Sequence, residues 1–341
     1  MTAPKKILII KTSSLGDVIH CLPVINDIHA HNQNVQIDWI VEESFADIPR
    51  MHAGVSNVFT VAMRRWKKSI FSLNTWAEIS DFKKLIKQNK YDAVIDCQGL
   101  LKSALITKQA LTTIKGEKHG YDAKNIREPI ASQFYEKKYA ISHQQHAVTR
   151  NRALCAMSLG YAVPTNAPDY GIAVKNDGSG SRMDIGSQSI DLKHLDINNY
   201  VIALHGTSRD SKLWPVENWL NLGKHLAKQN LKLVLPWASD AELARANEIA
   251  NQLTNSTVLP KLSIAQIAAV IANAKVAIGV DTGLSHLAAA LNIPIIALYT
   301  DTNPALTGVM GGKFAPAINL GGIDKIPSVD NVMVEFNLLK N

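Results

Sequence analysis

Two short loops decide how this chain folds: KTSSLGD at residues 11–17 and DTGLSH at residues 281–286. Each loop follows an apolar run typical of a buried strand, residues 7–10 in the first case and 276–280 in the second, and each opens a segment with helical periodicity. A strand, a glycine-bearing turn and a helix N-terminus in succession place polar groups at the carboxyl edge of a parallel sheet. Two copies of this pattern predict two α/β domains that face one another across a cleft.

The composition is that of an ordinary globular protein. The chain has 341 residues, of which 46% are hydrophobic and 19% charged, and this length is enough for two domains with separate cores. No apolar stretch approaches the roughly 20 residues of a membrane-spanning helix, and the N-terminal apolar run is too short for the core of a signal peptide. Cys21, Cys97 and Cys155 have neither metal-ligand nor disulfide-framework spacing. We therefore expect no metal site and a reducing, cytoplasmic compartment.

The net charge of +7 lies entirely in the first half of the chain. Residues 1–175 contain 23 basic and 15 acidic residues, whereas residues 176–341 contain 13 and 14. The densest basic cluster is RRWKK at residues 64–68. Such a cluster is consistent with a solvated surface, and also with a domain that meets acidic lipid head groups, nucleic acid or an anionic substrate.

Strand and helix patterns alternate along both halves, which predicts parallel, doubly wound sheets. In the first half we expect strands at residues 7–10, 36–41 and 93–96, and helices at 18–30 and 76–87. In the second half we expect strands at residues 201–204, 232–235, 276–280 and 293–298, and helices at 214–228, 241–253, 264–274 and 284–291.

Between the two halves the pattern stops, at the polar stretch NDGSGS of residues 176–181. This break predicts an N-terminal domain over residues 1–175, a linker or insertion over 176–199 and a C-terminal domain over 200–320. The tail, residues 321–341, has weak helical periodicity and could cross back to the first domain.

The loops of the second half suit a diphosphate group. The chain has no dinucleotide-type glycine motif, no P-loop and no nucleophile elbow. Backbone N–H groups around Gly283 could hold an anion at a helix N-terminus, although the same residues also suit a plain helix cap. The loop HGTSRDSK at residues 205–212 brings hydroxyls and Lys212 to the same edge. Glu242, after a neighbouring strand, could bind ribose hydroxyls.

Asp17 has two interpretations. Ser14 and Asp17 have the spacing of a capping box, and an acid in the first helical turn is favoured by the helix dipole. A carboxylate at this sheet edge could also act as a general base. The local pattern alone favours the cap.

Eight stretches of the chain, taken in order, resemble the lipopolysaccharide heptosyltransferase I group of glycosyltransferase family 9. They are residues 11–18, 37–43, 64–68, 96–103, 127–129, 144–148, 212–215 and 281–287. The resemblance covers nearly the whole chain apart from residues 177–196, which look like an insertion. It implies the α/β fold called GT-B: two Rossmann-like domains with parallel sheets facing across a central cleft.

The resemblance also implies a reaction and a place in the cell. Members of this group move L-glycero-D-manno-heptose, with inversion, from ADP-heptose to the Kdo of Kdo2-lipid A in the lipopolysaccharide inner core. It implies no metal or other cofactor, no nucleic-acid partner, and a peripheral position on the anionic cytoplasmic face of the inner membrane. A phosphorylated, carboxylate-bearing glycolipid acceptor suits the basic first half.

Residue roles follow from the matched positions. Asp17 corresponds to the base that takes the acceptor proton, and Lys212 to a cation that stabilises the leaving diphosphate. The donor-binding positions, with Lys212, are Thr207, Ser208, Glu242, Leu262, Asp281, Thr282, Gly283 and His286. The acceptor-binding positions are Ser14, Arg64, Arg65, Lys68 and Arg127. One turn departs from the group, because TDTNP at residues 300–304 replaces Gly-Pro-Thr-Asp-Pro.

Three other functions stay open on the sequence. A related heptosyltransferase could use a different acceptor, although the cluster at residues 64–68 together with Arg127 favours the Kdo-directed enzyme. A sugar-nucleotide epimerase of the same fold would convert the donor without an acceptor. A binding module without catalysis would need Lys212 and Asp281 but would have no use for Asp17.

Overall fold

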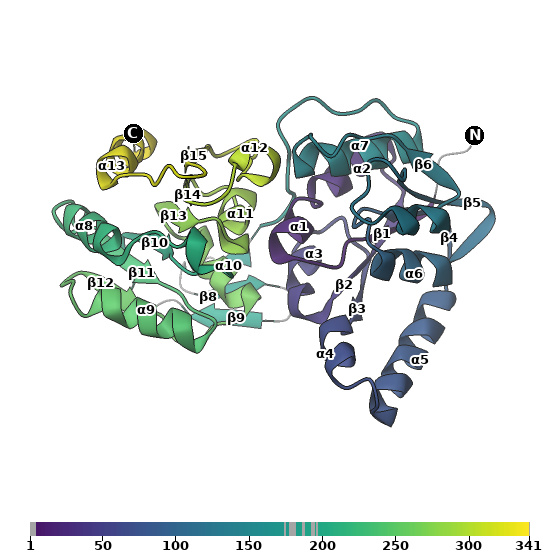
Figure 1. The fold of residues 1–341 in the computed structure, drawn as a ribbon, viewed down its shortest axis with the longest axis horizontal. Helices are drawn as coiled ribbons and strands as arrows, with labels where there is room; N and C mark the ends of the chain where they lie inside the picture. Colours follow the sequence, from purple (N-terminus) through teal and green to yellow (C-terminus); the bar gives the residue numbers. More distant parts are fainter. Residues whose placement is uncertain are drawn as a thin grey trace. The chain divides into compact units, whose positions relative to one another are not determined.

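The protein consists of two compact units, Met1–Asn166 and Ala167–Asn341 (Figure 1). The computed structural model describes residues 5–173, 175–176, 182–185, 188–191, 195 and 197–340. Each unit is built around a parallel six-stranded sheet covered by helices. The α/β class expected from the alternating patterns is therefore confirmed.

In the first unit, strands alternate with helices, and two 3₁₀ turns lie at Glu43–Phe45 and Pro129–Phe134. The elements in chain order are β1 (Lys6–Ile10), α1 (Leu15–Ile19), α2 (Pro23–His31), β2 (Gln36–Glu42), α3 (Asp47–Arg50), β3 (Asn57–Val61), α4 (Met63–Lys68), α5 (Leu73–Lys87), β4 (Lys90–Asp96), α6 (Leu101–Gln109), β5 (Leu111–Tyr121), β6 (Lys137–Tyr139) and α7 (Ala147–Leu159).

The second unit repeats this alternation after a small antiparallel sheet, with a 3₁₀ turn at Asp210–Lys212. The elements are β7 (Lys175–Asn176), β8 (Arg182–Ile185), β9 (Gln188–Asp191), β10 (Tyr200–Leu204), α8 (Val216–Ala227), β11 (Lys232–Leu235), α9 (Asp240–Ala250), β12 (Ser256–Val258), α10 (Ile264–Ala272), β13 (Val276–Val280), α11 (Gly283–Ala290), β14 (Ile295–Tyr299), α12 (Pro304–Thr307), β15 (Ala317–Gly321) and α13 (Val329–Lys340).

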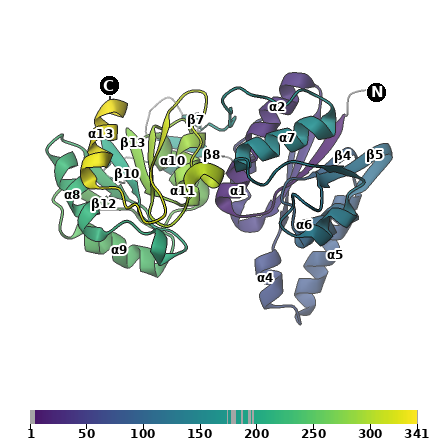
Figure 2. The same cartoon turned by 45° about the horizontal axis from the view of Figure 1, so that its top comes forward.

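The first sheet has the strand order β3-β2-β1-β4-β5-β6. Its central strand β1 is buried from Ile7 to Ile10, and Ile7 lies opposite Ile37 of β2 and Ala93 of β4. Helices α2 and α7 cover one face, and α5 and α6 cover the other (Figure 2). The chain direction across the sheet reverses between β1 and β4, and parallel sheets bind ligands beside the strand ends at such a reversal.

The second sheet has the same pattern, β12-β11-β10-β13-β14-β15, and reverses between β10 and β13. Its core contains Trp214 and Trp219, whose rings meet edge to face with centroids 5.0 Å apart. Phe336 of α13 is buried in the same core, so the C-terminal tail packs on this unit. In the second unit the predicted polar loops, residues 205–212 and 281–286, follow the two strands that flank the reversal, and in the first unit the predicted loop at residues 11–17 follows β1.

The helix expected over residues 18–30 is two helices. α1 ends at Ile19 and α2 begins at Pro23. Proline has no backbone N–H to continue the helical hydrogen-bond pattern but is well suited to the first helical position. The apolar pattern runs through this break because both helices bury apolar residues, Val18 and Ile19 in α1 and Val24, Ile25 and Ile28 in α2.

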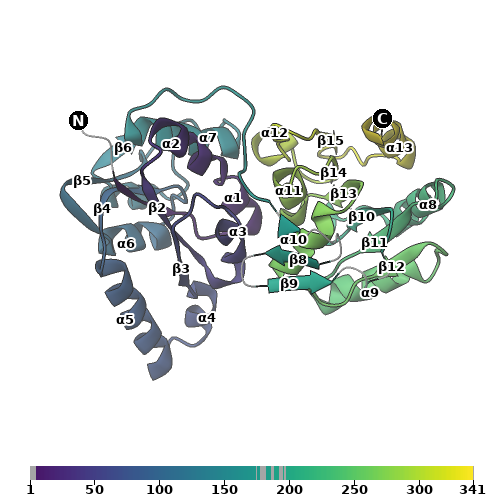
Figure 3. The ribbon, with the colours of Figure 1, turned by 180° about the vertical axis from the view of Figure 1, so that it is seen from behind.

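Part of the expected linker is folded. Strands β7, β8 and β9 form a three-stranded antiparallel sheet, and β8 and β9 lie beside α10 (Figure 3). Residues 177–181, 186–187, 192–194 and 196 of this segment lie outside the described residues. In the described part of the chain, no helix combines the length and the apolar character needed to cross a membrane.

Candidate functional site

In the first unit, the loop after β1 is held by the loop after β4. Oε1 of Gln98 accepts hydrogen bonds from the backbone N–H groups of Thr12 and Ser13, both at 3.0 Å. Nζ of Lys11 donates to the carbonyl oxygen of Cys97 at 2.8 Å. These cross-loop contacts fix the backbone that leads to α1. Sequence reasoning assigned no role to Gln98, although its place at the end of a buried strand could have indicated one.

Asp17 caps the helix to which it belongs. Its Oδ2 accepts hydrogen bonds from the backbone N–H of Ser14 at 2.8 Å and from the Ser14 hydroxyl at 3.0 Å. The capping box expected from the sequence is therefore present. No group in the described part of the chain bonds Oδ1, and the side chain is half-buried. One carboxylate oxygen orients Asp17 while the other stays available to accept a proton.

Lys102, which the sequence did not single out, belongs to the same cluster. Its Nζ donates to Oγ of Ser13 at 2.8 Å. Burial lowers the pKa of Lys102, nearby Glu42 and Asp17 act to raise it, and Arg64 acts to lower it. The bond from Lys102 to Ser13 joins α6 to the β1 loop, and the backbone N–H of Arg64 donates to Oε1 of Glu42 at 3.1 Å, which joins α4 to the end of β2.

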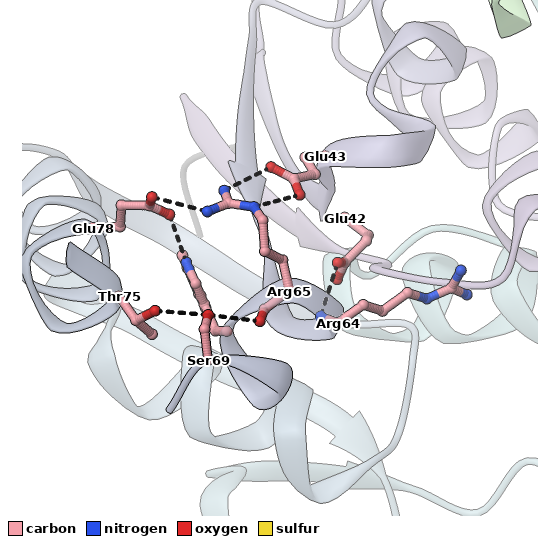
Figure 4. Close-up of polar contacts among 8 residues, drawn as sticks. Glu42, Glu43, Arg64, Arg65, Ser69, Thr75 and Glu78 are labelled. Atoms are coloured by element: carbon pink, nitrogen blue, oxygen red, sulfur yellow. Dashed lines mark hydrogen bonds and ion pairs between the residues drawn. The ribbon is translucent and has the colours of Figure 1, made fainter. Parts of the chain in front are cut away.

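The two adjacent arginines of α4 have different environments (Figure 4). Nε and Nη2 of Arg65 donate to Glu43 at 3.2 and 3.0 Å, and Nη1 donates to Glu78 at 2.9 Å. Hydrogen bonds to Glu43 and Glu78 raise the pKa of Arg65. The guanidinium of Arg64 points away from both carboxylates and lies 5.1 Å from the ring centroid of Phe45. Arg64 is thus available to an external anion, whereas the charge of Arg65 is already compensated.

The remaining residues predicted for the acceptor, Ser14, Lys68 and Arg127, are exposed. Within the described residues, neither Lys68 nor Arg127 forms an ion pair. Arg127 adjoins Glu128, whose Oε2 accepts the backbone N–H of Leu101 at 2.6 Å. This bond ties the Arg127 segment to the start of α6, the helix that carries Lys102.

In the second unit, three loops meet at Asp281. Nζ of Lys212 donates to Oδ2 of Asp281 at 2.6 Å, in an ion pair whose side chains are 17% and 13% exposed. Oγ1 of Thr302 donates to the same carboxylate oxygen at 2.8 Å. Oγ1 of Thr207 donates to the Asp281 carbonyl oxygen at 2.9 Å. The structure therefore brings together Thr207, Lys212 and Asp281, as the sequence predicted, and adds Thr302.

Thr302 lies in the turn at which the sequence departs from the group that it resembles. Its hydroxyl and the Lys212 ammonium share one oxygen of Asp281. The turn that differs from the group therefore adds a hydrogen bond to the cluster around Asp281. Only the fold could show this, because Thr302 is 21 residues from Asp281 along the chain.

The ion pair lies beside the N-terminus of α11. That helix begins at Gly283 with Thr282 as its N-cap residue. N–H groups in the first turn of a helix have no partner within the helix and form its positive end. An ammonium group has three protons to donate, and within the described residues Lys212 uses one. This edge therefore combines a cation with backbone donors.

Glu242 caps α9 and also approaches the loop after β10. Its Oε2 accepts the backbone N–H groups of Ala238 at 2.7 Å and Ser239 at 3.1 Å. A Cβ at position 206 would lie 2.5 Å from Oε1 of Glu242, so Gly206 is what allows this approach. The carboxylate thus reaches the same loop that carries Thr207.

The other predicted donor residues lie around this edge in different environments. Ser208 is exposed, Leu262 is half-buried just before α10, and His286 is buried within α11. No hydrogen bond is found for the Ser208 side chain among the described residues. Across the part of the chain that the structure describes, no group of three or more His, Cys, Asp or Glu side chains could hold a metal ion.

A buried titratable group lies beneath each loop cluster. In the first unit, Asp96 accepts hydrogen bonds from the backbone N–H groups of Gln98 and Gly99 and from the hydroxyl of Tyr135. Burial outweighs these bonds and raises the pKa of Asp96 to about 6. In the second unit, burial lowers the pKa of His205 to about 4. His205 is therefore neutral near pH 7, with Nε2 at 3.0 Å from the carbonyl oxygen of Pro236.

Known proteins share both the sequence and the fold of this chain. The model of glycosyltransferase family 9 (heptosyltransferase) matches residues 79–325. Lipopolysaccharide heptosyltransferase 1 of Salmonella typhimurium is 43% identical over 94% of this chain and 97% of that protein. The protein of the same name from Escherichia coli K12 is 44% identical over 90% and 91%.

The solved structure of E. coli heptosyltransferase WaaC with ADP is also similar, with a TM-score of 0.84 and 40% identity, over 98% of this chain and 99% of that one. The predicted pair of Rossmann-like domains is confirmed by this likeness and by the two sheet orders. Both the family match and the identity to its members extend over most of the chain. The chain belongs to glycosyltransferase family 9, the heptosyltransferases.

Proposed function

We propose that this glycosyltransferase moves L-glycero-D-manno-heptose from ADP-heptose to the Kdo of Kdo2-lipid A, with inversion at the anomeric carbon. The names of its relatives support an acceptor in lipopolysaccharide. Structures of WaaC with ADP and with ADP-2-deoxy-2-fluoro heptose support an ADP-linked heptose donor. The observation that carries the proposal is the meeting of Lys212, Thr207 and Asp281 beside the N-terminus of α11.

The second unit would bind the donor. Negative charge develops on the diphosphate as the bond from the heptose to ADP breaks, and a fixed cation with helix N–H donors stabilises such a leaving group. Lys212, Thr282 and Gly283 supply these groups, with Asp281 and Thr207 holding Lys212 and the loop in place. For the rest of the donor we propose contacts from Ser208 and His286, ribose hydroxyls at Glu242, and adenine against Leu262.

The first unit would bind and activate the acceptor. Oδ1 of Asp17 would take the proton of the attacking Kdo hydroxyl in a single displacement with oxocarbenium character. Oδ2 would remain bound to Ser14, which keeps the carboxylate oriented. We propose that Arg64, Lys68 and Arg127 bind carboxylate and phosphate groups of the acceptor.

Arg65 suits a different role from the one the sequence predicted. Its guanidinium is occupied by Glu43, in the 3₁₀ turn that follows β2, and by Glu78, within α5. We therefore propose that Arg65 positions α4, and through it Arg64, rather than binding the acceptor itself. Because the acceptor is a lipid, we also propose that the enzyme works as a peripheral protein on the cytoplasmic face of the inner membrane.

The test is to incubate the purified protein with ADP-heptose, with and without Kdo2-lipid A, and to follow ADP release together with the mass of the lipid. We expect ADP release that depends on the acceptor and a lipid that gains one heptose. Conversion of ADP-heptose without acceptor would instead indicate an epimerase. Donor binding without ADP release under both conditions would indicate a binding module. Transfer to a later core sugar but not to Kdo would indicate a different acceptor.

A further inference from the structure

The hairpin formed by α4 and α5 exposes large apolar side chains at its tip. Phe71 is 99% exposed, Leu73 86%, Trp76 53% and Ile70 49%. Single exposed apolar residues are normal on protein surfaces, but a contiguous group marks a binding surface. Nε1 of Trp76 donates to the carbonyl oxygen of Ile70 at 2.8 Å, which holds the two ends of this group together. We call these four residues the apolar tip.

Positive charge surrounds the apolar tip. Residues 63–90 contain eight basic and two acidic residues, a net charge of +6 against +7 for the whole chain. The two acids, Glu78 and Asp81, pair with Arg65 and Lys84. Lys67, next to the tip, is exposed and forms no ion pair within the described residues. The hairpin is therefore a strongly cationic element with an apolar end.

Polar contacts join the two helices of the hairpin (Figure 4). Glu78 of α5 accepts hydrogen bonds from Nη1 of Arg65 at 2.9 Å and from Nε1 of Trp66 at 2.7 Å. These bonds hold the pKa of Glu78 below its usual range. Oγ of Ser69 lies 3.0 Å from Oγ1 of Thr75 across the turn. The two helices are thus fixed to each other, and their apolar ends project away from the first sheet (Figures 1 and 3).

We propose that the apolar tip docks this enzyme on an anionic phospholipid bilayer. Phe71 and Leu73 would enter the boundary between head groups and acyl chains, and Trp76 would lie at the level of the head groups. Lys67 and the other cations of the hairpin would contact lipid phosphates. A few inserted apolar side chains surrounded by basic residues bind a membrane reversibly, as a peripheral enzyme requires. The net charge of +6 favours an anionic bilayer over an apolar protein surface.

This docking would bring the acceptor residues to the membrane surface. α4 has six residues, so a rise of 1.5 Å per residue makes it roughly 9 Å long. Arg64 at its start would then lie just above the inserted tip, at the height of sugars carried on a lipid. Only this placement of Arg64 near the acceptor rests on the proposed function. Docking on the bilayer does not depend on the acceptor.

The test measures sedimentation of the full chain with vesicles of phosphatidylglycerol and phosphatidylethanolamine, and with vesicles of phosphatidylcholine, all without lipopolysaccharide. We expect binding to the anionic vesicles that weakens as salt rises, and little binding to phosphatidylcholine. Phe71→Ser with Leu73→Ser should reduce binding at least tenfold, because two large apolar side chains no longer enter the lipid. Lys67→Gln should reduce it about fivefold.

Matched controls use the same substitutions elsewhere. Phe314 is 64% exposed and follows Lys313, and Ile114 is fully exposed and precedes Lys115. Phe314→Ser and Ile114→Ser should leave vesicle binding unchanged. A second readout is fluorescence quenching by brominated lipid. Trp76 is the exposed tryptophan among the six in the chain, so Trp76→Phe should remove most of the quenching.

Three results would overturn the proposal. The first is absence of binding to anionic vesicles, and the second is binding by the Phe71→Ser/Leu73→Ser variant that equals binding by the parent protein. The third is conversion of a dimer to a monomer by that variant, because the apolar tip would then be covered by a second copy of this chain. Heptose transfer to a soluble, deacylated acceptor separates this inference from the proposed function. The tip variant should keep that activity and lose transfer to acceptor in vesicles. If no acceptor supports transfer by any form of the protein, the proposed function fails while the vesicle result still decides docking.

Discussion

The two units share one strand order but connect their loops by contacts of different charge. In the first unit, the amide oxygen of Gln98 joins the loop after β4 to the loop after β1. In the second, the ion pair between Lys212 and Asp281 joins the corresponding loops. In the first unit the Lys11 ammonium also joins these loops, but it donates to the neutral carbonyl oxygen of Cys97. Asp17 has no ion-pair partner among the described residues, which suits a base. The ionic contact places a cation where a diphosphate would leave. Under the proposed function, the same sheet edge would serve a different half of the reaction in each unit.

The largest effect is expected from Asp17→Asn. Asparagine keeps an oxygen to accept the Ser14 N–H, so the cap survives, but it cannot take a proton. ADP release should fall about 10³-fold, as loss of a general base usually does, with an unchanged Tm. Activity within a few-fold of the parent protein would show that Asp17 is a helix cap and nothing more.

Lys212→Gln should have the next largest effect. Without the cation, the leaving diphosphate loses its main electrostatic partner, and kcat/KM for ADP-heptose should fall about 10²-fold. Steady-state kinetics at saturating acceptor measure this. Lys224→Gln, at an exposed lysine of α8, serves as the control and should change nothing. Equal donor kinetics for both variants would remove Lys212 from the donor site.

The buried groups should give the two units opposite responses to pH. Asp96 has a pKa of about 6 in the folded state, so it stays protonated at pH values at which this group has already ionised in the unfolded chain. Its contribution to the stability of the folded state therefore falls as pH rises from 4 to 6. His205 has a pKa of about 4 in the folded state, so it stays neutral at pH values at which this group is protonated in the unfolded chain. Its contribution to the stability of the folded state therefore falls as pH drops from 6.5 to 4. Between pH 4.5 and 7.5 each effect is roughly 2 kcal/mol.

Urea unfolding of Asp96→Asn and His205→Gln at both pH values measures these contributions as differences from the parent protein. Relative to the parent, Asp96→Asn should gain stability at the higher pH and His205→Gln at the lower. A parallel pH dependence for a variant and the parent would show that the group concerned titrates normally.

The smallest effects should separate the two neighbouring arginines. Arg64→Gln should raise the acceptor KM about tenfold through loss of a charged contact, without a change in Tm. Arg65→Gln should lower Tm slightly and alter the acceptor KM less, because its partners are Glu43 and Glu78. The reverse pattern would return Arg65 to the acceptor site.

Most inner strands could be predicted from the sequence, but the outer strands and the inner strand β5, much of which is exposed or half-buried, could not. β1, β10 and β13 are continuous apolar runs because both faces of these strands are buried. β3 and β15 lie at sheet edges, where exposed and half-buried residues weaken the pattern. The helix expected over residues 76–87 is α5, in which Ile86 is buried but Trp76 is 53% exposed.

For the site, the chemical groups could be predicted from the sequence, but not all of their partners. Lys212 and Asp281 could be named because each follows a predicted strand, and the shared sheet edge implied that they meet. The position of Gln98 after a predicted strand marks it as a candidate, but the sequence does not show that Gln98, Lys102 and Thr302 meet partners 86, 89 and 21 residues away along the chain. Such contacts depend on which strands are neighbours and on side-chain reach, neither of which local patterns encode.

The division of labour between the two units is the central claim, and calorimetric titration with ADP-heptose in the absence of acceptor tests it most directly. We predict that Asp17→Asn binds the donor with the affinity of the parent protein, whereas Lys212→Gln binds it at least tenfold more weakly. Loss of donor affinity in Asp17→Asn, or full affinity in Lys212→Gln, would contradict the assignment of the base to the first unit and of the diphosphate to the second.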